Sequence, residues 1–129
     1  MSLSTVAARE QSILEYFAAS DSGDVEGQLS RVSPDVSFRL GNNPAIVGRT
    51  EVSKLRSRMR THVQIVHRVD RIVVDASGRS AAAELSVRYR KADGSTLTVP
   101  ACAVISFTEA GLIDTYHVYV DQQNFFDGP

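Results

Sequence analysis

The chain has 129 residues, of which 43% are hydrophobic and 22% are charged, and these values predict one globular domain over residues 1–129. The formal net charge of −1 argues against nucleic-acid or membrane partners held by charge. The single cysteine, Cys102, excludes an internal disulfide and a multi-cysteine metal site. No apolar run approaches the roughly 20 residues of a membrane-spanning helix, and the start has no signal-peptide pattern, so a cytoplasmic protein is predicted.

The first third of the chain has helical periodicity. Apolar residues recur at three- and four-residue spacings over residues 6–18, and this stripe predicts a first helix that ends at Gly23. Asp24 is a typical N-cap for a second, shorter helix, which Pro34 would close. The inward face of that second helix is predicted to be Val25, Leu29 and Val32.

A short strand and a third helix are predicted next. The strand covers residues 36–40, and Thr50 is a plausible N-cap for a helix over about 51–60. The inward residues of this helix are predicted to be Val52, Leu55 and Met59. Its basic residues, with Arg49 before them, are interpreted as a solvated face, because nucleic-acid binding would need stacking aromatics that this helix lacks. These basic residues are Lys54, Arg56, Arg58 and Arg60.

From residue 62 onward the pattern is that of strands. Four extended segments are predicted at about 62–75, 79–91, 95–107 and 112–121. Hairpin-type turn sequences separate them, so they form an antiparallel meander. The tail after residue 121 carries Phe125 and Phe126, which are expected to pack against the domain.

The segment 83–90 alternates strictly between apolar and polar residues. One face carries Ala83, Leu85, Val87 and Tyr89, and the other carries Glu84, Ser86, Arg88 and Arg90. The polar side of such a strand normally faces water, but in a sheet that curls around a pocket it would line the pocket. The pattern leaves both possibilities open.

The order of elements resembles the NTF2-like superfamily, and within it the SnoaL-like and ketosteroid-isomerase-like branch. Three stretches carry the resemblance: Tyr16–Glu26, Val47–Glu51 and Gly111–Asp121. The resemblance implies an α+β, NTF2-like (cystatin-like) cone in which three N-terminal helices pack in a curved mixed or antiparallel sheet around an apolar pocket. It also implies a homodimer through the outer sheet face.

Three known chemistries of this superfamily use side chains whose positions correspond to residues of this chain. Ketosteroid isomerases pair a tyrosine, matched by Tyr16, with two aspartates; their positions hold Leu40 and Ala103 here, so the base is missing. Limonene-type epoxide hydrolases use an Asp-Arg-Asp set that activates water. The corresponding positions hold Ser86, Glu84 and Val118 in this chain, so the set is not reproduced.

Scytalone-dehydratase-like members give the best partial match. They use a histidine after the third helix and an aspartate at the end of the first, which correspond to His67 and Asp21. With Tyr16 as a hydroxyl donor, these two residues are the catalytic candidates, and an outward-facing His67 is the alternative. The candidate substrate-binding residues are Phe38, Leu40, Glu84, Ser86, Arg88, Ala101, Ala103, Tyr116 and Val118.

No metal site or cofactor site is predicted. His62 and His67 are five residues apart on a strand and point to opposite faces, and the sequence has no glycine-rich phosphate loop.

Two functions fit the sequence. The first is a cofactor-independent isomerase, cyclase or dehydratase acting on a small hydrophobic molecule of polyketide, steroid or terpenoid type. The second is a non-catalytic ligand-binding or dimerisation module on the same fold. If the polar face of 83–90 lines the pocket, the outer face becomes apolar and predicts a homodimer. This outer face would carry Leu85, Val87, Tyr89, Thr115 and Tyr119.

Overall fold

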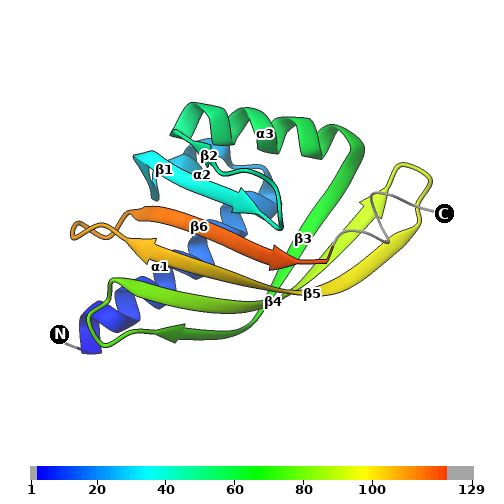
Figure 1. Cartoon of the computed structure of the whole chain (residues 1–129). Helices are drawn as coiled ribbons and strands as arrows, with labels where there is room; N and C mark the ends of the chain where they lie inside the picture. The colour runs from blue at the N-terminus through cyan, green and yellow to red at the C-terminus, as the bar shows by residue number, and fades with distance from the viewer. Residues whose placement is uncertain (1–2, 122–129) are drawn as a thin grey trace.

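The computed structural model describes residues 3–121, so Phe125 and Phe126 lie outside the described residues (Figure 1). The helices and strands follow one another in the order α1(Leu3–Ser22), α2(Val25–Leu29), β1(Val32–Leu40), β2(Ile46–Val47), α3(Arg49–His62), β3(Val63–Val74), β4(Ser80–Lys91), β5(Thr96–Phe107) and β6(Ile113–Val120). Within these residues, no helix is both long enough and apolar enough to cross a membrane.

The strands form one mixed sheet in the order β2-β1-β6-β5-β4-β3. Strand β1 runs parallel to β6, and every other neighbouring pair is antiparallel. The four-strand meander is confirmed. The description of three N-terminal helices is not: α2 has only five residues, and α3 follows β1 and β2.

The boundary between α2 and β1 differs from the prediction. Helix α2 ends at Leu29, and Val32 lies in β1, where it is 3% exposed. Pro34 therefore does not close a helix. It lies where the register between β1 and β6 shifts, between Val32 and Ser37, and a residue without an N–H is tolerated at such an irregularity.

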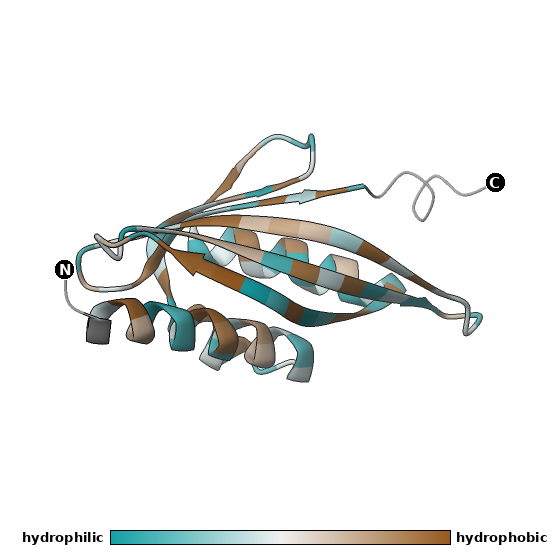
Figure 2. Cartoon of the chain, turned by 90° about the horizontal axis from the view of Figure 1, so that it is seen from below, coloured by the Kyte–Doolittle hydropathy of each residue, from teal (hydrophilic) through white to brown (hydrophobic). Residues whose placement is uncertain are grey.

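The core lies between the helices and the inward face of the sheet. Helix α1 contributes Ile13, Tyr16 and Phe17, which belong to one cluster with buried residues of β1, β3, β4, β5 and β6. Apolar and polar residues alternate along the strands, as the colours in Figure 2 show. The alternation sends one side chain in two to the core.

The apolar face of β4 points toward the core. Leu85, Val87 and Tyr89 point inward, with at most 3% of each exposed, whereas Glu84 and Arg88 are exposed on the outer face. Glu84, Ser86 and Arg88 therefore do not line the pocket, and their assignment as candidate substrate-binding residues is wrong.

Those outward residues make surface contacts instead. The Ser86 hydroxyl donates to Asp70 at 2.7 Å, and this bond, with a second from Arg68, holds the pKa of Asp70 below its usual value. Glu84 pairs with Arg71 at 3.5 Å. Water and neighbouring side chains satisfy these groups, which avoids the cost of burying charge in a pocket.

Helix α3 begins differently from the prediction. Its N-cap is Gly48, with φ 100° and ψ 140°, and no side chain caps the first turn. That backbone conformation is unfavourable for residues with a Cβ atom. Thr50, the predicted cap, lies within the first turn and is exposed.

We expect Gly48→Ala to lower the free energy of unfolding by about 1–3 kcal/mol through backbone strain, since a Cβ there would contact nothing within 4 Å. Thr50→Ala should change it by less than about 0.5 kcal/mol. Urea denaturation of both variants checks this. A loss of about 1 kcal/mol for Thr50→Ala with no loss for Gly48→Ala would assign the cap to Thr50.

Candidate active site

A cavity opens between α3, the end of α1 and the inward face of the sheet. It contains about 530 Å³ of empty space, including its open mouth. Most of its wall is apolar or aromatic, with a few polar groups, as in many small-molecule sites. The lining residues are Ser20, Phe38, Leu40, Arg56, Met59, Arg60, Ile65, His67, Val87, Tyr89, Tyr116 and Val118.

Six of the predicted binding residues lie on the inward face of the sheet, and four of them reach the cavity. Those four are Phe38, Leu40, Tyr116 and Val118. Ala101 and Ala103 also point inward, at 9% and 0% exposure, but they do not line the cavity. The prediction that Ala101 and Ala103 border the cavity is therefore wrong.

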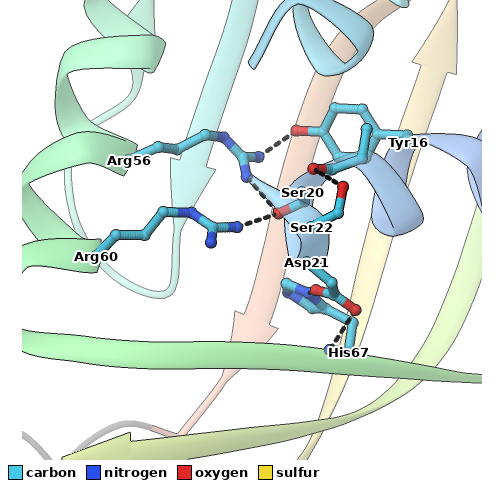
Figure 3. Close-up of polar contacts among 8 residues, drawn as sticks. Tyr16, Ser20, Asp21, Ser22, Arg56, Arg60 and His67 are labelled. Atoms are coloured by element: carbon cyan, nitrogen blue, oxygen red, sulfur yellow. Dashed lines mark hydrogen bonds and ion pairs between the residues drawn. The ribbon is translucent and has the colours of Figure 1, made fainter. Parts of the chain in front are cut away.

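His67 and Asp21 come together across the fold. Asp21 is in the last turn of α1 and His67 is in β3 (Figure 3). Imidazole Nδ1 lies 2.7 Å from Asp21 Oδ1, and the backbone N–H of His67 donates to Asp21 Oδ2 at 3.0 Å. The side chains are 14% and 21% exposed. The alternative of an outward-facing His67 is thereby excluded.

This contact fixes the tautomer of a neutral His67. An ionised carboxylate only accepts hydrogen bonds, so Nδ1 carries the proton and Nε2 keeps an unshared electron pair. The ring also packs on Phe17, with centroids 4.9 Å apart. The histidine is therefore held in one orientation and can accept a proton at Nε2.

Tyr16 lies behind the cavity wall. It is 2% exposed, and its hydroxyl accepts a hydrogen bond from the Arg56 guanidinium. The guanidinium carbon of Arg56 lies 5.2 Å from the centroid of the Tyr16 ring and 5.1 Å from that of Phe38. Tyr16 thus positions an arginine and does not itself line the cavity.

Tyr116 completes this aromatic cluster. Its ring stacks on Phe38 with centroids 5.4 Å apart. Burial raises the pKa of the Tyr116 hydroxyl well above its ordinary value. Tyr116 is therefore neutral at physiological pH and remains a potential hydrogen-bond donor in the cavity wall.

Sequence reasoning missed two cavity residues, Arg56 and Arg60. The sequence predicts a solvated helix face for both, yet both are partly buried and line the cavity. The signal was available: with buried Val52 they form a row at four-residue spacing, which places them on one helix face. Arg58, between them, is exposed as predicted.

No group of three or more histidine, cysteine, aspartate and glutamate residues in the described range, 3–121, is arranged to hold a metal ion.

The sequence matches the SnoaL-like domain over residues 13–116. Among curated proteins, none matches it. Many solved structures share its fold. A candidate polyketide cyclase from Xanthomonas campestris pv. campestris has a TM-score of 0.85 at 21% identity, covering 92% of this chain and 94% of its own.

Two further structures are similar at lower identity. SalBIII, an epoxide hydrolase/cyclase-like enzyme of pyran ring formation in the polyether salinomycin, has a TM-score of 0.81 at 17% identity, covering 91% and 93% of the two chains. RV0760c from Mycobacterium tuberculosis, in complex with estradiol-17beta-hemisuccinate, has a TM-score of 0.77 at 18% identity, covering 85% and 91%. At these identities the likeness establishes a shared NTF2-like fold.

Proposed function

The chain belongs to the SnoaL-like domain family, and from that premise we propose that its cavity binds a small, mostly apolar molecule on which His67 acts as a general base. The observation that carries this proposal is the His67–Asp21 pair, with its 2.7 Å contact, in the wall of an otherwise largely apolar cavity. The reaction is an isomerisation, cyclisation or dehydration that needs no cofactor.

The proposed step is a proton transfer. Nε2 of His67 takes a proton from an acidic C–H or O–H of the bound molecule, and the N–H bond forms as that bond breaks. The electron pair stays on the substrate as an enolate or alkoxide. The imidazolium that forms is stabilised by the Asp21 carboxylate, which also holds the ring in place.

The cavity wall supports a polyketide-, steroid- or terpenoid-like substrate. Apolar and aromatic side chains favour a hydrophobic body through burial of its surface. Related folds occur in proteins described as cyclases or epoxide hydrolases, and one was solved with a steroid ester. These neighbours support the ligand class, while the reaction rests on His67.

Deuterium exchange tests the proton transfer without knowledge of the natural substrate. In D₂O, the protein should accelerate deuterium uptake next to the carbonyl of small bicyclic ketones such as 2-tetralone, measured by mass spectrometry. If these ketones bind but take up deuterium no faster than in buffer alone, the proposal that His67 is a general base is wrong.

The second candidate is a non-catalytic binding module. It is favoured by Leu40, which lines the cavity at the position corresponding to the missing base of the ketosteroid isomerases. A module of this kind binds the ketones but exchanges no protons, so the same experiment separates the two functions.

We also propose that the protein is a homodimer through the outer sheet face. Thr115 and Tyr119 are exposed there, but Leu85, Val87 and Tyr89, predicted to lie on it, are buried inside. The outer face instead carries exposed Val73 and Val104, at 51% and 44%, which lie in register through Ala82.

Exposed apolar rows of this kind occur at interfaces. Sedimentation at micromolar concentration should give twice the chain mass of 14.1 kDa, and Val104→Asp should shift the species toward the monomer. A wild-type protein of 14.1 kDa would contradict the dimer.

A further inference from the structure

Two arginines of α3 converge on one buried serine of α1. Arg56 Nη1 and Arg60 Nη2 both donate to Ser20 Oγ, at 3.4 and 3.1 Å (Figure 3). Ser20 is 2% exposed, and all three residues line the cavity. Two like charges thus approach one oxygen atom, an arrangement that repulsion disfavours unless an anion lies nearby.

No carboxylate of the described residues, 3–121, pairs with either arginine. Asp21, the acidic group near the cavity, is occupied by His67. Arg56 is partly compensated by the rings around it and by the Tyr16 hydroxyl. Arg60 has no such ring contact among these residues. This end of the cavity is therefore positively charged.

The junction where Ser20, Arg56 and Arg60 meet offers more hydrogen-bond donors than acceptors. The Ser20 oxygen accepts from both arginines, so its two lone pairs are used and its hydroxyl hydrogen remains to be donated. Arg56 Nε is buried and has no partner in residues 3–121. A buried donor without an acceptor is costly, and a bound anion would satisfy these groups together.

A second cavity reaches the same junction from the helix side. It contains about 410 Å³ of empty space between α2, α3 and the end of α1, and Ser20, Arg56 and Arg60 line it too. Gln28 also lines it; this side chain is 6% exposed, and its Nε2 has no partner in residues 3–121. A further donor without a partner in residues 3–121 therefore lies in a cavity that the arginine pair also lines.

We propose that Ser20, Arg56 and Arg60 bind a carboxylate of the ligand, whose apolar body lies in the cavity beside His67. This inference rests on the proposed binding function and adds a charged group to the substrate class. We expect the ligand to carry a single negative charge. Arg56 already has aromatic and hydroxyl partners, so Arg60 supplies the guanidinium fork that is open to the ligand. Planar carboxylates match that fork with two parallel hydrogen bonds.

The test compares two probes of nearly equal shape: 2-naphthoate, which carries a carboxylate, and neutral 2-naphthamide. Because the chain has no tryptophan, naphthalene fluorescence reports binding directly. Wild-type protein should bind the naphthoate more tightly. Arg60→Met should weaken naphthoate binding by about 10- to 100-fold, the value of a charged hydrogen bond, and change naphthamide binding by less than about twofold.

Arg58→Met is the matched control, since it removes the same charge from the exposed side of the same helix; it should leave both affinities unchanged. Arg60→Lys keeps the charge but loses the fork, and should recover part of the naphthoate affinity. Thermal melts of all variants establish that they are folded.

Equal binding of both probes to wild-type protein, or equal losses for Arg60→Met and Arg58→Met, would overturn the carboxylate site while leaving the apolar cavity in place. Binding of neither probe would reject the proposed binding function and this inference with it.

Discussion

Replacing His67 with alanine is expected to lower the rate of protein-catalysed deuterium exchange into 2-tetralone by about 10²- to 10⁴-fold, the usual contribution of a positioned general base. The substitution removes Nε2, the acceptor of the proton, while ketone affinity should change little because apolar residues form most of the cavity wall. Mass spectrometry of the ketone over time measures the rate, and fluorescence or calorimetry measures binding.

Two further variants make this result specific. Asp21→Asn leaves a similar shape but no longer favours the Nδ1–H tautomer, so exchange should also slow, with less effect on ketone binding. His117→Ala removes a histidine of the outer face, whose ring contacts the Gly41 carbonyl at 3.2 Å, and should have no effect. If the His67→Ala variant exchanges deuterium at the wild-type rate, another group is the base.

The second large effect is expected from filling the cavity. Val118 is 8% exposed and lines the cavity, so Val118→Phe would put a ring where a ligand lies. We expect the affinity for neutral 2-naphthamide to fall by about 100-fold or more, because hydrophobic pockets are sensitive to single methylene groups. The cost to folding should stay within about 1–3 kcal/mol.

Val47→Phe is the control for this variant. Val47 lies in β2, is 61% exposed and does not line the cavity, so the added ring enters solvent and ligand affinity should be unchanged. Unchanged binding by Val118→Phe would place the ligand outside the cavity.

The four strands of the meander were predicted well because their patterns are local, whereas β1, predicted over 36–40, spans Val32–Leu40 and β2 was not predicted. The predicted segment 79–91 differs from β4, Ser80–Lys91, by one residue. Alternation and hairpin turns specify such strands without knowledge of the rest of the fold. Helix ends were less accurate, since the N-cap of α3 depends on the backbone conformation of Gly48, which composition alone does not reveal.

The assignment of strand faces needed the tertiary structure. Alternation in β4 divides Leu85 and Val87 from Glu84 and Arg88 but does not say which set is inside. Desolvation decides it: two charged side chains facing an apolar cavity would each need a partner there. On the outer face, Glu84 pairs with Arg71 instead.

The sequence predicted only part of the candidate site. Asp21 and His67 are 46 residues apart, and only the family resemblance linked them. Arg56 and Arg60 were missed because a basic helix face normally lies in water, although their spacing from Val52 placed them with the core. Aromatic rings and buried hydroxyl groups around Arg56 compensate its charge, and such partners become known only in three dimensions.

The tautomer of the His67 ring is the most direct test of its role as the base. Long-range ¹H–¹⁵N NMR of labelled protein resolves the ring nitrogens of its three histidines, and His67→Ala assigns the signals. A neutral His67 protonated at Nδ1, with a bare Nε2 whose signal shifts when 2-tetralone binds, is the predicted result. A neutral His67 protonated at Nε2, unaffected by the ketone, would contradict its role as the base.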